Sequence, residues 1–195
     1  MILFTNSGEL DIRAATTLGV NVKEGDSPIG FFGTGLKYAI AVLLRTGHSI
    51  KIHSGQTVYD FGTQPIAIRG KEFQFIELIE HTPTECNVRE LGFTTELGKT
   101  WELWQVYREL YSNTLDEHGE IHKISSITDA VPFLGAGQTS IVVSGPDFDA
   151  VHDRRWEFLI NRDRVPIYTN GVLEVYSGIS EFAFYRGIRA HKFDK

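Results

Sequence analysis

Residues 28–37 read Pro28-Ile29-Gly30-Phe31-Phe32-Gly33-Thr34-Gly35-Leu36-Lys37, and an apolar run over residues 38–45 follows directly. Glycine tolerates positive φ and lets another group approach the backbone closely. The apolar run has little polar face and ends at Gly47, which predicts a largely buried helix. Because a helix N-terminus offers unpaired N–H groups and a partial positive charge, glycines before a helix can form a phosphate cradle. A tight loop leading into a buried helix is the alternative that the glycines alone leave open.

Composition places the chain among globular proteins. It has 195 residues, of which 42% are hydrophobic and 23% charged, and this predicts a domain with a substantial core. The formal net charge of −6 disfavours duplex nucleic acid and anionic membranes as partners. Cys86 is the only cysteine, so no internal disulfide can form and a reducing cytoplasm fits. No apolar stretch is long enough to span a bilayer, and we expect a soluble, cytoplasmic protein.

The rest of the chain alternates strand-like runs with turns and two further helical segments. Residues 9–27 look like a connecting segment with one helical turn near residues 12–18, and residues 81–98 and 120–137 look irregular. Thr100 is the expected N-cap of a helix over residues 101–117, closed near Gly119, and a helical turn is expected within residues 147–160. Strands are expected at residues 2–5, 49–53, 57–61, 66–69, 73–79, 140–143, 172–176 and 182–188.

These segments predict one α+β domain over residues 1–195. Short breaks between the strands of residues 49–79 favour an antiparallel meander. We expect a two-layer sandwich, in which helices cover one face of a mixed or antiparallel sheet.

The helix over residues 101–117 carries polar groups opposite an apolar stripe. Glu109, Asn113 and Asp116 recur at steps of four and three residues, so they share one side. The simpler interpretation is the solvated face of a surface helix. A carboxylate and an amide one turn apart can also divide a metal–nucleotide task, because an amide oxygen suits Mg²⁺ and a carboxylate can activate water. The apolar stripe consists of Leu103, Trp104, Tyr107, Leu110, Tyr111 and Leu115.

Two segments together resemble the GHKL (Bergerat-fold) ATP-binding family, which includes the gyrase B subunit, heat-shock chaperone ATPases, sensor histidine kinases and the mismatch-repair protein MutL. Residues 29–37 resemble its second glycine box, and residues 109–117 its N box. The resemblance implies that Glu109 is the general base for water and that Asn113 holds Mg²⁺ against the nucleotide, with Asp116 nearby. It also implies that residues 19–27 fall in the ATP lid. The residues implied to close over the phosphates are Gly30, Gly33, Thr34, Gly35, Leu36 and Lys37.

The order of the boxes implies a circular permutation, since the N box comes first in ordinary members of the family. The strand at residues 2–5 with Asn6-Ser7-Gly8 then resembles the adenine-reading box, and Asn6 and Gly8 would contact the nucleotide. The strand at residues 140–143 would pair beside it. The family carries Asp where this chain has Asn6, so base choice is open, and Asp11 can stand in if the loop bends suitably.

The resemblance implies an ATP-binding protein with ATP and Mg²⁺ as cofactors, and a slow ATPase using Glu109. The alternative is a non-catalytic protein-interaction or inhibitor module that retains the fold. A phosphotransferase ranks last, because no paired phosphoacceptor histidine helix is visible. A protein partner or a homodimer is expected, whereas a membrane is not. Two short basic–aromatic clusters, residues 154–156 and 185–189, favour edge-strand surface over a nucleic-acid contact.

Overall fold

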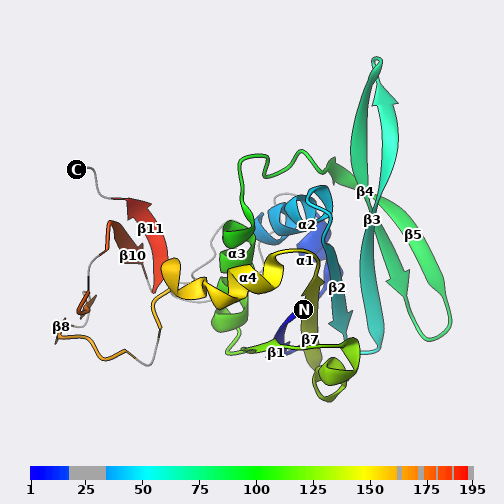
Figure 1. Ribbon diagram of the computed structural model, residues 1–195. Helices are drawn as coiled ribbons and strands as arrows, with labels where there is room; N and C mark the ends of the chain where they lie inside the picture. The colour runs from blue at the N-terminus through cyan, green and yellow to red at the C-terminus, as the bar shows by residue number, and fades with distance from the viewer. Residues whose placement is uncertain (18–33, 162–163, 171–173, 179, 186, 193–195) are drawn as a thin grey trace. The chain divides into compact units, whose positions relative to one another are not determined.

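The computed structural model describes residues 1–17, 34–161, 164–170, 174–178, 180–185 and 187–192 (Figure 1). The chain divides into two compact units, residues 1–152 and 153–195. The expectation of one nucleotide-binding domain over residues 1–195 stays a prediction. The described part of the chain contains no helix that is both long and apolar enough to cross a membrane.

A seven-stranded antiparallel sheet forms the larger unit, in the order β5-β4-β3-β2-β7-β1-β6. The predicted antiparallel meander is confirmed by β2, β3 and β4, and the strand expected at residues 140–143 pairs with β1 as the resemblance implies. The strands are β1 (Ile2–Ser7), β2 (Ser49–Ser54), β3 (Thr57–Ile68), β4 (Lys71–His81), β5 (Cys86–Thr94), β6 (Glu120–Lys123) and β7 (Gln138–Ser144).

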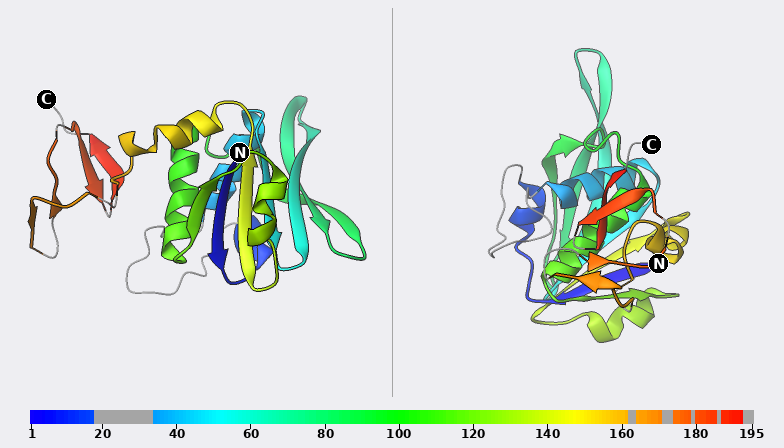
Figure 2. Two further views of the ribbon diagram at one scale, coloured as in Figure 1. Left: turned by 60° about the horizontal axis from the view of Figure 1, so that its bottom comes forward. Right: turned by 90° about the vertical axis from the view of Figure 1, so that its left-hand side faces the viewer.

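Helices cover one face of this sheet (Figure 2). They are α1 (Ile12–Thr16), α2 (Gly35–Arg45) and α3 (Leu103–Asp116), with α4 (Phe148–Asp153) packing its Phe148 ring 5.9 Å from the ring of Tyr107 in α3. Alternate residues of β1 and β2 point into this layer, so Phe4 meets Tyr107 edge to face at 5.5 Å. The predicted α+β two-layer fold is confirmed.

The opposite face of β1 and β7 is closed by the 3₁₀ helix η1 (Ile127–Phe133). A small cluster fills this side, built from Leu3, Val142, Ile124 and Ala130, all at most 7% exposed. Residues 120–137, expected to be irregular, therefore hold both β6 and η1. A four-residue strand and a seven-residue 3₁₀ helix are too short to leave a clear hydrophobic period in the sequence. The expectation that this segment is irregular was therefore wrong.

The smaller unit contains the 3₁₀ helix η2 (Arg155–Glu157) and two hairpins. One hairpin pairs β8 (Tyr168–Thr169) with β9 (Glu174–Val175), and the other pairs β10 (Phe182–Tyr185) with β11 (Ile188–Lys192). The strand expected over residues 182–188 is thus two strands, because Gly187 has φ 79° and the chain reverses near it.

Three further expectations are corrected. Residues 57–68 form one strand rather than two, with Gly62 and Pro65 inside it. Residues 81–98, expected to be loop-like, contain β5. The helix predicted from residue 101 begins at Leu103, and its N-cap is Glu102, whose carboxylate caps the first turn in a capping box with Gln105.

Candidate functional site

The first residue of α2 lies against the carboxyl group of Glu109 in α3. Gly35 has no side chain, and a Cβ built on it would overlap the carboxyl atoms of Glu109. The start of α2 and the polar side of α3, which are far apart in the sequence, therefore meet at this point. Only glycine permits such an approach without displacing the carboxylate.

Asn113 lies one helical turn beyond Glu109 and contacts it. Its Nδ2 donates a hydrogen bond to Oε1 of Glu109 at 3.3 Å. Both side chains are half-buried, because the other side of α3 faces the sheet. The residues of α3 that anchor it there are Val106, Tyr107, Leu110 and Tyr111, none more than 8% exposed. The three-residue and four-residue spacing that predicted this face is confirmed.

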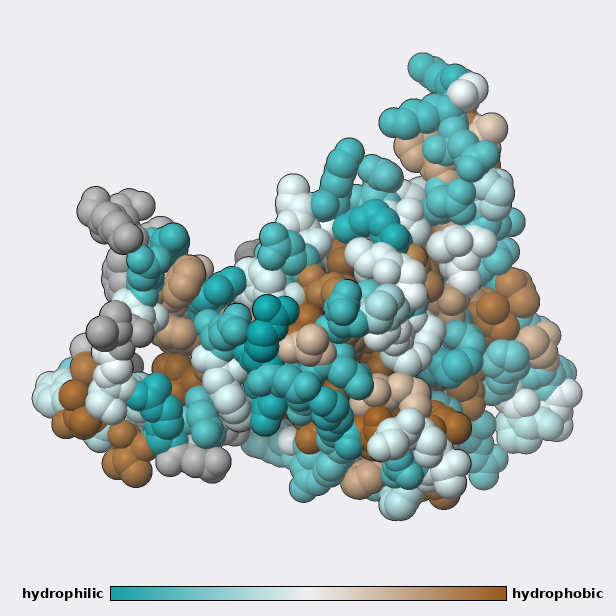
Figure 3. Space-filling model, in the orientation of Figure 1, coloured by the Kyte–Doolittle hydropathy of each residue, from teal (hydrophilic) through white to brown (hydrophobic). Residues whose placement is uncertain are grey.

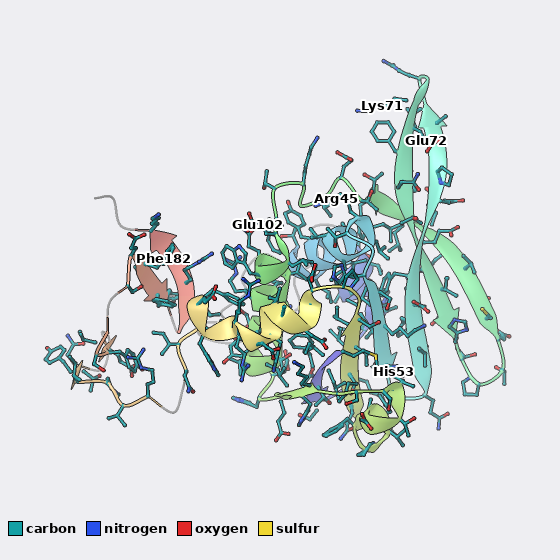
Figure 4. All side chains as sticks on the ribbon, in the orientation of Figure 1. Arg45, His53, Lys71, Glu72, Glu102 and Phe182 are labelled. Atoms are coloured by element: carbon teal, nitrogen blue, oxygen red, sulfur yellow. The ribbon has the colours of Figure 1, made fainter. Side chains whose placement is uncertain are left out.

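A second set of contacts fixes α2 against the segment that leads into α3. Arg45, in the last turn of α2, donates to the carbonyl groups of Thr95, Leu97 (3.2 Å) and Gly98 (3.1 Å) (Figure 4). Tyr38 meets the ring of Trp101 edge to face at 5.1 Å. These contacts tie α2 to the segment that precedes α3.

Lys37 lies in the first turn of α2 and is fully buried. Its Nζ donates to the carbonyl oxygen of Ala14 in α1 at 2.9 Å. Burial lowers the pKa of the Lys37 ammonium from its usual range, because desolvation disfavours the charged form. The predicted contact of Lys37 with phosphate stays a prediction, and in this structure the lysine ties α2 to α1.

The end of β1 lies beside the end of α3. A Cβ on Gly119 would overlap the carbonyl oxygen of Thr5 and lie 2.8 Å from Cβ of Asn6. Asn6 follows Phe4 on the side of β1 that faces the helices, and its Nδ2 donates to the Ser7 carbonyl at 3.0 Å. The predicted adenine-reading residue therefore lies near the C-terminal end of the helix that carries Asn113.

Gly8 directly follows the last residue of β1 and has φ 91°, a conformation that favours glycine. Thr139 Oγ1 donates to its carbonyl oxygen at 2.8 Å and accepts from the Leu10 N–H at 2.9 Å. The next residues lead into α1, whose N-cap is Asp11. Hydrogen bonds from Arg13 lower the pKa of Asp11 to about 2. In this structure the Asp11 carboxylate thus accepts hydrogen bonds from α1.

Among the other predicted residues, Thr34 is the N-cap of α2, and its carbonyl oxygen accepts from the Tyr38 N–H at 3.0 Å. Leu36 and Asp116 are half-buried, in the first turn of α2 and the last residue of α3. Gly30 and Gly33, like residues 19–27, lie outside the described residues.

Sequence reasoning missed two contributors to this region. Ala14 acts through its backbone carbonyl, so no side-chain pattern could reveal it. Gly119 was interpreted only as a helix terminator, whereas it also lets α3 approach Thr5 and Asn6. In the sequence, a glycine that ends a helix looks the same as a glycine that permits a close backbone approach, and only the tertiary structure distinguishes the two.

The Glu109 carboxylate and the Asn113 amide are two oxygen-bearing side chains in contact on α3. Within the described ranges, no three His, Cys, Asp or Glu side chains form a group that could hold a metal ion. Mg²⁺ at nucleotide sites commonly takes one or two protein ligands and completes its shell with phosphates and water. The Asn113 amide oxygen and the Glu109 carboxylate are hard oxygen groups of the kind that such a metal takes as ligands. Comparison of the chain with protein-family models, with curated proteins and with solved structures finds no match.

Proposed function

We propose that this chain is an ATP-binding protein of the GHKL type and a slow Mg²⁺-dependent ATPase. In this proposal Glu109 is the general base for water, Asn113 holds Mg²⁺, and the N-terminus of α2 receives the phosphates. Asn6 reads the base at the end of β1. When bound, Mg-ATP supplies the phosphoryl group and the metal that neutralises its charge.

One observation carries the proposal: Gly35 lies against the Glu109 carboxyl group, one turn from Asn113. A helix N-terminus can bind an anion, a carboxylate can act as a base, and an amide oxygen can bind a hard metal ion. Here the three groups lie next to one another. The order of β7 and β1 in the sheet, with Asn6 at the end of β1, also supports the permuted arrangement.

The residues of the chain have separate tasks in this mechanism. Gly35 lets the Glu109 carboxylate lie at the start of α2, where the phosphate would bind, because a side chain at this position would overlap that carboxylate. Glu109 accepts a proton from the attacking water, and the hydrogen bond from Asn113 orients its carboxylate. Turnover is expected to be slow, since no segment offers an obvious cationic finger to stabilise the transferred phosphoryl group.

Thermal unfolding with and without Mg-ATP tests binding. A ligand present at about 100 times its Kd and bound only by the folded state adds about 2.7 kcal/mol of stability. For a chain of this size that corresponds to a Tm increase of about 5–10 °C. An unchanged Tm across millimolar Mg-ATP would overturn the proposal and favour the non-catalytic interaction module.

Phosphate release tests the role of Glu109. Glu109→Ala should bind Mg-ATP at least as tightly as the native chain while hydrolysis falls by about 10²–10⁴-fold, the usual contribution of a general base. Glu117→Ala, an exposed carboxylate at the end of the same helix, is the matched control and should leave both unchanged. Equal phosphate release by the Glu109 variant would reject its assignment as the base.

A further inference from the structure

The β3–β4 hairpin extends past its neighbours and forms a two-stranded arm, residues 63–74 (Figure 1). β2 pairs with β3 only as far as Asp60, and β5 pairs with β4 from His81 only as far as Phe75, with one further backbone bond from Thr95 to Gln74. Arg69 and Gly70, with φ 52° and 76°, form the turn at its tip. A two-stranded ribbon is marginally stable in water unless something packs on it.

One face of the arm is apolar and points away from the helices. Opposed residues share a face, so Ile66 with Phe73 and Gln64 with Phe75 lie together, opposite to the buried side that carries Ile76. Ile68 at the tip is 47% exposed, and Lys71 lies over the Phe73 ring at 5.0 Å. Figure 3 shows hydrophobic side chains exposed among hydrophilic ones along this arm.

The base of the same face is acidic. Glu77 of β4 and Glu90 of β5 are directly opposed, a like-charge arrangement that destabilises a sheet. Gly62 lies opposite Glu77 on this face and carries no side chain, and a Cβ built on it would be 3.9 Å from Glu77 Oε2. Glu90 accepts a hydrogen bond from Gln64 at 3.0 Å, and no ion pair reaches either carboxylate from the residues that the structure describes.

We propose that this face, residues 62–77 with Glu90, is a docking surface for a second copy of the same chain. The face is self-complementary when two copies pack with their strands antiparallel, the tip of each over the base of the other. Lys71 of one copy then meets Glu77 and Glu90 of its partner copy, and Ile68 lies over Gly62. In the centre, Phe73 packs over Phe75 and Ile66 over the aliphatic part of Gln64.

The register of the strands fixes this match. The pair Ile68–Lys71 and the pair Gly62–Glu77 lie equally far from the middle of the face, so one two-fold axis satisfies both ends at once. Packed sheets lie about 10 Å apart, and the axes of their strands are within about 30° of each other. Side chains of this size can fill the space between two such sheets. The face is small, so we expect the interface to bury less than about 1,200 Å² of accessible surface in total and the dimer to be reversible.

Sedimentation equilibrium over a concentration series tests the proposal. The native chain should dimerise reversibly, and high salt should weaken the dimer because ion pairs contribute to it. Lys71→Glu should raise the dimer dissociation constant by about tenfold or more, since it sets a carboxylate against Glu77 and Glu90 at both ends. Glu90→Lys should raise it less, because Lys71 still meets Glu77 beside the new lysine. An equimolar mixture should dimerise more tightly than Lys71→Glu alone, because one end then keeps Lys71 against two carboxylates and the other sets the new carboxylate at residue 71 against the new amine at residue 90.

Lys99→Glu is the matched control, since it changes net charge equally at an exposed residue outside this face. Far-UV circular dichroism and Tm of every variant check that the fold is intact. A native chain that stays monomeric at all concentrations would overturn the proposal and leave the face to another partner or to water. A dimer that ignores both charge reversals, or a mixture that fails to recover, would overturn it equally.

Discussion

Replacing Gly35 by alanine should stabilise the chain only when the Glu109 side chain is absent. Alanine in a helix is more favourable than glycine by up to about 1 kcal/mol. In the native chain its Cβ overlaps the Glu109 carboxyl group, so the carboxylate must swing away and lose the Asn113 hydrogen bond. A hydrogen bond of this kind contributes about 0.5–1.5 kcal/mol. The gain and the loss nearly cancel, and Gly35→Ala alone should be neutral or mildly destabilising.

In the Glu109→Ala background the overlap is gone, and the same alanine should stabilise by about 0.5–1 kcal/mol. The double-mutant cycle should therefore give a coupling of about 1 kcal/mol between residues 35 and 109. Urea unfolding of the four chains measures it, with equal m-values as the check that unfolding is two-state. If Gly35→Ala stabilised both backgrounds equally, the contact between α2 and α3 at this point would be wrong.

Two further predictions concern residues that brace the site. Because burial lowers the folded-state pKa of Lys37, the unfolded chain holds this proton to higher pH, so stability should rise from the folded-state pKa toward about pH 10.5. Urea unfolding of native and Lys37→Met chains between neutral and alkaline pH checks this, and an equal pH slope in both would contradict it. Gly119→Ala should destabilise by about 2–4 kcal/mol, because its Cβ overlaps the Thr5 backbone oxygen. Calorimetry measures this loss, with Gly135→Ala, which has open space around it, as the control.

The elements that the sequence could predict are those with a strong period. Apolar residues at helical spacing predicted α2 and α3 to within two residues at most ends, and alternating strands predicted β2 and the start of β3. β5 was not predicted, because its residues 86–90 are all exposed, as an edge strand allows. Their sequence therefore shows no alternation of apolar and polar residues. Breaks at Gly62 and Pro65 were expected for good local reasons. At Pro65, however, β2 no longer pairs with β3, and no other strand among the described residues takes its place, so the missing N–H leaves no ladder bond unmade.

The candidate site divides in the same way. That Glu109 and Asn113 share one face of a helix followed from their spacing, and the structure confirms it. That Gly35 touches Glu109 depends on how α2 and α3 pack, which no local pattern determines. The bond from Lys37 to Ala14 links a side chain to a backbone oxygen in another helix, so it also depends on the tertiary fold.

The contact of Gly35 with Glu109 also explains why binding and hydrolysis should respond differently to one substitution. The N-terminus of a helix favours a negative charge, and in this structure the Glu109 carboxylate lies against the first residue of α2. A phosphate arriving at the same place would meet a like charge, and part of its binding free energy would move the carboxylate aside. Glu109→Ala removes that competing charge together with the base. Affinity for Mg-ATP should then rise or hold while hydrolysis is lost, whereas a carboxylate that merely braced the fold would weaken both when removed.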